Sequence, residues 1–213
     1  MSSDMITIEQ LTDLLRRFHD LVIKNQSRLT ELDSAIGDAD HGINMARGMT
    51  AVIGKLAGIQ PAHVNELFKT VAMTLVTSVG GASGPLYGTF FLRFASTAGP
   101  AIELDADALD TALHAGLTGI MERGKAEVGD KTMIDALSPA LDAMEMVIKN
   151  GGDLAAAVTA ARDAAAAGRD ATVPLVARKG RASYLGERSA GHLDPGAASM
   201  SLLFDALAAE CAN

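Results

Sequence analysis

The sequence contains few of the residues that mark several large classes of protein. It has no tryptophan, its aromatic residues amount to 4% of the chain, and Cys211 is the one cysteine among 213 residues. A lone cysteine cannot form an internal disulfide, and it fits a reducing compartment. The segment Met1–Asp4 has no basic stretch followed by an apolar run, and no uninterrupted apolar stretch is long enough to span a bilayer. We therefore expect a soluble cytoplasmic protein that does not enter a membrane.

Positive charge is scarce as well. The chain has 18 Lys and Arg against 26 Asp and Glu, which gives a net charge of −8. This balance argues against a nucleic-acid partner or an anionic membrane surface, because phosphate groups attract clustered cations. Hydrophobic residues make up 48% of the chain, mostly as small and aliphatic side chains that favour closely packed helices. The length fits one domain that covers residues 1–213.

Helical periodicity dominates the sequence, and almost no segment alternates between apolar and polar residues as a strand does. Thr7 to Gln10 reads as a capping box that starts the first helix, and Pro61 suits the first position of a later one. The fold class that we predict is all-α, with about eight helices in an up-and-down bundle or closed barrel. The helical segments that we expect cover residues 8–25, 28–36, 41–58, 61–79, 85 onward, 105–123, 132–149, 154–167 and 197–209.

An acidic turn interrupts this helical pattern at residues 33–42. On a continuous helix Asp38 would point away from Asp33 and Asp40, so the three acids converge only if the helix stops. We expect Gly37 to end it in a left-handed conformation. Carboxylates that converge need a cation between them. Such oxygen ligands suit Mg²⁺ or Ca²⁺, and a site with few carboxylates suits Mg²⁺ that completes its shell with water and substrate phosphates. The alternative is a solvated Asp33, with Asp38 capping a turn and Asp40 as the N-cap of the next helix.

Two further segments have the composition of an anion site. Residues 80–88 form a glycine-rich turn that contains Ser83 and leads into a helix whose first residue we expect to be Pro85. Free amides at such a helix start bind anions, although the same glycines would also serve a tight connection between helices. Residues 178–188 gather four cations in an otherwise acidic chain. Arg181 and Arg188 could bind phosphate oxygens, although a charged run is more often a solvated loop.

The glycines and lysine of residues 119–126 have P-loop spacing, but Ala126 replaces the required Ser or Thr and the segment reads as helical, so we reject a P-loop. Asp194 and Pro195 locally predict an ordinary helix start. Together with the acidic turn, the glycine-serine loop and the basic segment, this start describes a nucleotide held through magnesium.

The same motifs occur in the same order in the ADP-binding L subunit of dihydroxyacetone kinase, which the sequence resembles over essentially its whole length. The resemblance rests on residues 32–45, 80–88, 129–137, 180–188 and 191–197. The acidic motif of the family usually reads Gly-Asp-Gly-Asp-His-Gly, so Ala39 is a departure. It would cost on the order of 1 kcal/mol if its φ is positive and little if its φ is negative.

The resemblance implies an eight-helix barrel with ADP or ATP at one end and two Mg²⁺ ions on Asp33, Asp38 and Asp40. Ser83 and the Ala82 and Ser83 amides would bind phosphate, and Arg181 would add positive charge. We interpret His41 and His192 as nucleotide or helix-cap contacts and not as phosphocarriers. The residues implied to line the nucleotide are His41, Gly42, Ile43, Asn44, Ala82, Ser83, Gly124, Met133, Arg181, Asp194, Pro195 and Gly196.

The family has two arrangements, and this chain resembles the free subunit rather than the form fused to a sugar-binding domain. The resemblance therefore implies a phosphoenolpyruvate-dependent glycerone kinase subunit of glycerol metabolism. Its bound ADP is phosphorylated in place by a phosphotransferase-system subunit, and a partner subunit holds dihydroxyacetone and supplies any catalytic base. Three alternatives remain: the nucleotide subunit of a split ATP-dependent ketose kinase, a nucleotide-loaded partner of a transcriptional regulator, and a magnesium-dependent phosphohydrolase. A homodimer is also left open.

Overall fold

The computed structural model describes residues 4–211, and most of these residues are helical. The Met1–Ser3 part of the stretch in which we expected no leader lies outside the described residues. The all-α prediction is confirmed, with two three-residue strands added. In chain order the elements are β1 (Met5–Thr7), α1 (Ile8–Ile36), α2 (His41–Leu56), α3 (Val64–Ser78), α4 (Ser83–Ala98), β2 (Glu103–Asp105), α5 (Ala106–Gly124), α6 (Ile134–Lys149), α7 (Leu154–Ala171), the 3-10 helix η1 (Arg181–Ser189) and α8 (Pro195–Cys211).

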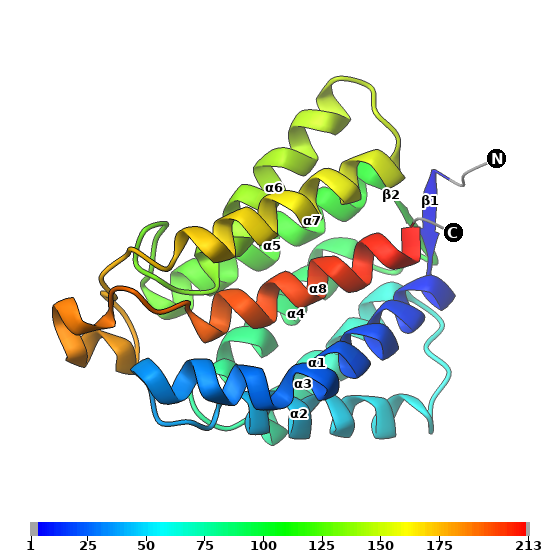
Figure 1. Cartoon of the computed structure of the whole chain (residues 1–213). Coiled ribbons are helices and arrows are strands. Elements are labelled where there is room, and N and C mark those ends of the chain that lie inside the picture. Colours follow the sequence, from blue (N-terminus) through cyan, green and yellow to red (C-terminus); the bar gives the residue numbers. More distant parts are fainter. Residues whose placement is uncertain (1–3, 212–213) are drawn as a thin grey trace.

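The eight α-helices of the described chain form a closed ring. Each helix packs against the next in sequence, and α8 returns to pack against α1 (Figure 1). Strand β1 pairs with β2 in an antiparallel register that places Ile6 opposite Leu104. This pairing lies at the end of the molecule that carries both termini, and η1 lies at the opposite end (Figure 1). None of the helices in residues 4–211 is both long and apolar enough to cross a membrane.

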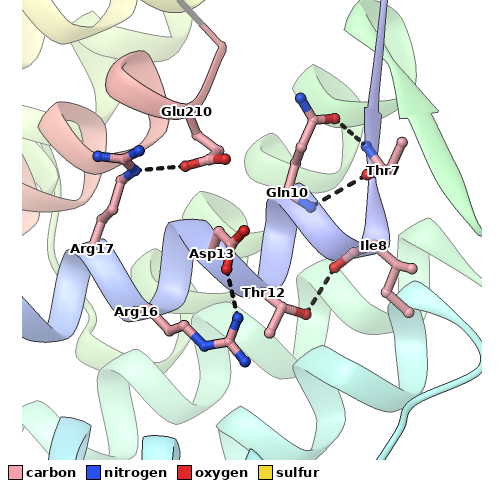
Figure 2. A network of polar contacts seen from close by, with 8 residues as sticks. All are labelled: Thr7, Ile8, Gln10, Thr12, Asp13, Arg16, Arg17 and Glu210. Atoms are coloured by element: carbon pink, nitrogen blue, oxygen red, sulfur yellow. Dashed lines mark hydrogen bonds and ion pairs between the residues drawn. The ribbon is translucent and has the colours of Figure 1, made fainter. Parts of the chain in front are cut away.

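Helix α1 begins as its sequence predicts. The Thr7 amide donates to Gln10 Oε1 at 2.9 Å, and the Gln10 amide donates to Thr7 Oγ1 at 3.3 Å. These two reciprocal bonds are the capping box, which satisfies amides that the first helical turn leaves free. Further along α1, Arg17 forms an ion pair of 2.6 Å with Glu210 near the end of α8 (Figure 2). This contact joins the first and last helices of the ring.

Several expected helix boundaries were wrong, and three of them lie in α1, α3 and α7. The break between residues 25 and 28 is absent and α1 runs to Ile36, because no glycine or proline interrupts this stretch and the Asn25 side chain bonds to the Leu21 carbonyl within the helix. Helix α3 begins at Val64 and not at Pro61. Helix α7 continues through Gly168 to Ala171.

Gly168 has a packing role that explains its place inside a helix. A Cβ there would lie 2.2 Å from the Asp135 carbonyl oxygen and 2.7 Å from Pro139 Cγ. Glycine therefore lets α7 approach α6 closely, and the conformational freedom that usually marks a helix end is not what this position uses.

Candidate functional site

The end of the ring that carries η1 contains a cavity of about 390 Å³. This volume is in the range of small-molecule sites. Five separate segments line it: the turn after α1, the start of α4, the connection from α5 to α6, the segment entering η1 and the start of α8. A more open groove between α2 and α3 has a single carboxylate, Glu66, among its lining residues. Of the expected site residues, those lining the cavity are Asp33, Asp38, Asp40, His41, Ala82, Ser83, Gly124, Met133, Arg181, Asp194, Pro195 and Gly196.

The three acids of the turn converge. One oxygen from each of Asp33, Asp38 and Asp40 lies within 4.8 Å of the others, and no other such cluster occurs in residues 4–211. Asp33 is buried, Asp40 is half-buried and Asp38 is exposed to the cavity mouth. The Asp40 side chain makes no capping bond to α2, so it is free to bind a ligand. A hard, all-oxygen set of this kind fits a magnesium ion.

Asp33, and not Asp40, caps α2. Its Oδ2 accepts hydrogen bonds from the amides of Asp40 at 2.8 Å and His41 at 3.1 Å. A negative charge at a helix start is favourable because the free amides and the helix dipole are positive there. These bonds fix the Asp33 carboxylate in the orientation that faces the other two acids.

The turn stops α1 in a different way from the one we expected. Gly37 has φ −138°, so the prediction of a left-handed Gly37 was wrong. Glycine is needed there because a Cβ would lie 2.1 Å from Asp33 Oδ1. The left-handed residue of the turn is Ala39, with φ +62°. Alanine in place of the family's glycine at position 39 therefore costs folding free energy on the order of 1 kcal/mol.

A helix start faces the acidic turn across the cavity. Helix α4 begins at Ser83, two residues before the expected Pro85, so the Ser83 hydroxyl and the first amides of the helix lie together. From η1, Arg181 reaches over the cavity and its Nε lies 2.9 Å from Asp38 Oδ2. Residues 181–188 of the basic segment lie in this 3-10 helix, which is kinked at Gly186, and Arg181 and Arg188 are both exposed to solvent.

The inner wall contains two buried charged residues. Asp194 Oδ2 accepts a hydrogen bond of 2.7 Å from the Ala197 amide, so it caps α8 as the sequence predicts. Burial raises the pKa of Asp194 to about 7, against the opposing effect of this hydrogen bond. Lys131, only 1% exposed, donates from Nζ to the carbonyls of Thr172 at 2.6 Å and of His192. Burial lowers the pKa of Lys131.

A buried hydrogen-bonded chain lies behind Ser83. His41 Nδ1 is 3.1 Å from Ser83 Oγ, and His41 Nε2 is 2.9 Å from Ser199 Oγ. The Tyr87 hydroxyl lies 2.8 Å from the same Ser199 Oγ. Burial lowers the pKa of His41, and the nearby Asp33 and Asp40 oppose this shift. Both ring nitrogens of His41 therefore lie within hydrogen-bonding distance of a serine hydroxyl.

Sequence reasoning missed Lys131, Tyr87 and Ser199. Lys131 had a signal: it is a cation within a motif, Gly129 to Leu137, that otherwise reads as a plain helix start. It lies before the start of α6 with a φ of +63°, and its side chain is buried, with Nζ bonded to the Thr172 carbonyl. Tyr87 and Ser199 had no local signal, because each simply occupies a buried position of a helix.

Three expected nucleotide residues do not line the cavity. Gly42 lies where α2 crosses α1, since a Cβ there would be 2.1 Å from the Gln26 carbonyl oxygen. Ile43 is 49% exposed on the outer side of α2. Asn44 is buried and its Oδ1 accepts a hydrogen bond of 2.7 Å from Arg47.

Comparisons with known proteins identify the family of the chain. Residues 35–209 match the family model described as the DAK2 domain. The chain belongs to the DAK2 domain family. This DAK2 domain is 47% identical over 193 residues to the PEP-dependent dihydroxyacetone kinase 1, ADP-binding subunit DhaL, of Listeria innocua, covering 91% of each chain. It is 43% identical over 199 residues to the PEP-dependent dihydroxyacetone kinase, ADP-binding subunit DhaL, of Escherichia coli, covering 93% of this chain and 95% of that one.

A solved structure shows the same fold. The DAK2 domain aligns with the dihydroxyacetone kinase from C. freundii in complex with AMP-PNP and Mg²⁺ at a TM-score of 0.69 and 30% identity. The alignment covers 92% of this chain and 33% of that one. The resemblance seen in the sequence is therefore confirmed, and this DAK2 domain spans about a third of the larger kinase.

Proposed function

We propose that this chain is the nucleotide-binding subunit of a dihydroxyacetone kinase. It holds ADP through magnesium, the ADP is phosphorylated in place by a phosphotransferase-system subunit, and the phosphoryl group passes to dihydroxyacetone on a partner subunit. The observation that carries this proposal is the convergence of Asp33, Asp38 and Asp40 opposite the Ser83 helix start in one cavity. The names of the relatives at 43% to 47% identity support the same reading.

In this proposal the three acids bind the metal and the start of α4 binds the phosphates. Bound Mg²⁺ would neutralise the nucleotide phosphates and hold them for transfer. Asp33, Asp38 and Asp40 would hold the metal, with water and phosphate oxygens completing its coordination, and we propose two ions because the family resemblance implies two. The Ser83 hydroxyl and the first amides of α4 donate to the phosphates. Arg181 adds a positive charge at the cavity mouth.

The rest of the cavity holds the nucleoside. Gly124, Met133 and the segment from Asp194 to Gly196 line its inner part. At Gly124 a Cβ would lie 3.5 Å from Leu86 Cδ2, so the close contact there is with an apolar side chain. Two separate subunits, the phosphoryl donor and the dihydroxyacetone-binding subunit, would approach the exposed mouth. We place this subunit in the cytoplasm, where a free thiol such as Cys211 persists.

The test separates the two sources of the phosphoryl group. The ADP-loaded chain is incubated with phosphoenolpyruvate and the phosphotransferase proteins, or with ATP alone, and the bound nucleotide is then identified by mass. We expect ATP on the chain only when the phosphotransferase donor is present. Rapid exchange of bound ADP for free ATP, with turnover on dihydroxyacetone and no donor, would favour the split ATP-dependent kinase instead.

A further inference from the structure

The motif at residues 129–137 contains a buried cation that has no role in the proposed function. Lys131 lies in the cavity wall and is only 1% exposed. Its backbone has φ +63°, a conformation that is strained for a residue with a Cβ. A buried charge and a strained backbone both cost folding free energy, and such costs gather at functional sites. Lys131 is therefore a candidate for a functional residue.

The turn before α6 presents Lys131 from a fixed position. The Asp135 carboxylate accepts hydrogen bonds from the Gly129 amide at 2.5 Å and from the Thr132 amide at 2.7 Å, on either side of Lys131. Asp135 is itself buried in the first turn of α6. The turn is thus built on α6, and the Lys131 side chain leaves it from a place that α6 determines.

The ammonium group of Lys131 joins two segments that are far apart in the sequence. Its Nζ donates to the carbonyl oxygens of Thr172 at 2.6 Å and Val173 at 3.3 Å, just after α7. It also donates to the carbonyl oxygen of His192, just before α8. We call these two segments, residues 172–173 and 191–194, the neck.

Two backbone amides also join the two sides of the neck directly. The Gly191 amide donates to the Val173 carbonyl oxygen at 2.7 Å, and the Asp194 amide donates to Thr172 Oγ1 at 3.0 Å. These bonds hold the sides of the neck together, whereas the bonds of Lys131 tie both sides to the start of α6. The place of the neck relative to the cavity wall therefore depends on Lys131.

The neck closes a loop, residues 174–190, that contains η1 (orange in Figure 1). Of residues 181–189, which form η1, Ser189 is the one that is buried. An element with so little buried surface is held mainly at its ends, so its position follows that of the neck. From this loop Arg181 reaches back over the cavity to Asp38 Oδ2 at 2.9 Å.

We propose that Lys131 is a positioning residue that fixes the neck, holds Arg181 over the cavity and thereby slows the release of bound nucleotide. The inference rests on the proposed function, since it needs nucleotide phosphate beneath Arg181. The three N–H donors of the Lys131 ammonium group are used by three carbonyl oxygens. Lys131 therefore acts through the loop and does not bind phosphate itself.

The variant Lys131→Met tests the role of the ammonium group, because it keeps an unbranched side chain and removes all three donors. The carbonyl oxygens of Thr172 and Val173 keep a second hydrogen bond, from the amides of Leu175 and Gly191. We therefore expect the variant to fold. If it does not fold, Lys131→Gln, which retains a donor on a shorter side chain, takes its place in the same measurements.

Limited proteolysis measures how firmly the loop is held, whether or not nucleotide binds. The trypsin sites of the loop are Arg178, Lys179, Arg181 and Arg188. We expect cleavage there to be about tenfold faster in Lys131→Met than in the parent chain, because the loop opens locally more often. Cleavage at the parent rate would overturn the proposal.

The matched control is Leu104→Ala, which removes buried apolar atoms from β2 at the opposite end of the molecule (Figure 1). It should lower the unfolding free energy of the chain without faster cleavage in the loop. If both variants accelerate loop cleavage in proportion to their loss of stability, Lys131 serves overall stability and the proposal is wrong.

The release of ADP tests whether the loop acts on the nucleotide. N-methylanthraniloyl-ADP bound with Mg²⁺ is chased with excess MgADP in a stopped-flow instrument, and its fluorescence gives the dissociation rate. We expect Lys131→Met to release the analogue about tenfold faster than the parent, as for the loss of one charge-assisted hydrogen bond. Lys131→Gln should lie between the two.

A second background shows whether Lys131 acts through Arg181. In Arg181→Ala, adding Lys131→Met should change the dissociation rate by less than about twofold, because the side chain that the loop positions is already absent. An equal acceleration in both backgrounds would show that Lys131 acts by another route and would overturn the proposal.

The proposed function and this inference fail in different ways. If the parent chain binds MgADP and Lys131→Met releases it at the parent rate, the role of Lys131 is wrong and the proposed function stands. If the parent chain does not bind MgADP, both are wrong. Faster loop cleavage together with faster release that depends on Arg181 supports the proposal.

Discussion

At the scale of single residues, the three acids of the turn are not equivalent. Asp33 accepts two amide hydrogen bonds at the start of α2, so it serves the fold and the site together. Asp38 pairs with Arg181, whose side chain is 67% exposed, and an exposed pair of this kind contributes little to stability. Variants that remove Asp33 or Asp38 should therefore separate the contribution to folding stability from the contribution to nucleotide binding.

We expect Asp38→Ala to lose bound nucleotide and remain as stable as the parent within about 0.5 kcal/mol. We expect Asp33→Ala to lose nucleotide and also about 1–3 kcal/mol of unfolding free energy, because two amides lose their acceptor. Urea unfolding and the nucleotide content of the purified variants measure the two effects. An Asp38→Ala chain that keeps its nucleotide would show this acid to be a structural cap.

Ala39 offers a second test at this scale. Its φ of +62° is strained for a residue with a Cβ, and glycine removes the strain at the expense of a more flexible unfolded chain. Ala39→Gly should therefore raise the unfolding free energy by about 0.5 kcal/mol, measured by the urea midpoint at constant m-value. The control Ala35→Gly, at an exposed position within α1, should lower it by about 1 kcal/mol. Destabilisation by both variants would contradict this account.

Asp194 should make stability depend on pH. Its folded pKa, raised to about 7 by burial, lies above the unfolded value of about 3.9. Between these values the folded chain holds a proton that the unfolded chain releases, so the unfolding free energy falls as the pH rises, by at most about 1.4 kcal/mol per pH unit. Asp194→Asn keeps an oxygen for the Ala197 amide and should flatten the decline between pH 5 and pH 7. An equally steep decline in both proteins would rule this out.

At the scale of elements, the sequence predicted a helix boundary correctly where a capping side chain close in sequence determines it. The Thr7 and Gln10 capping box and the Asp194 N-cap lie where their residue types predict. Gly37 ends α1 as its residue type predicts, and only its expected left-handed conformation was wrong. Gly168 also reads locally as a helix end, but a distant element decides there, because the close approach of the α6 backbone requires glycine inside α7. Such contacts are not visible in the order of residues.

The crossing of α1 and α2 gives a test at this scale. A Cβ at Gly42 would lie 2.1 Å from a backbone oxygen of α1, so Gly42→Ala must move the two helices apart. We expect a loss of about 1–3 kcal/mol and weaker nucleotide retention, since Asp33 and Asp40 lie on the two sides of this crossing. Gly54→Ala, in the same helix with no atom within 4 Å of the added Cβ, should instead stabilise by about 1 kcal/mol. Similar thermal unfolding of both variants would refute the packing role.

At the scale of the whole molecule, the ring of helices brings five separate segments to one end. Helix periodicity predicted the helices but could not predict that α8 closes on α1, or that Ser199 would lie beside His41, 158 residues away. The acidic turn, the glycine-serine loop and the Asp194 helix start were predicted to form one site from their residue types, and the family resemblance implied the same. The residues behind them, Tyr87 and Lys131, required the folded structure.

The most direct test of the central claim is the nucleotide content of the purified chain. The protein is prepared without added nucleotide and denatured, and any released small molecule is identified and quantified by chromatography and mass. We expect about one equivalent of ADP, lost after treatment with a magnesium chelator and absent from Asp38→Ala. A chain that carries no nucleotide and does not bind ADP with Mg²⁺ would contradict the account, because the acidic turn would then have only a structural role.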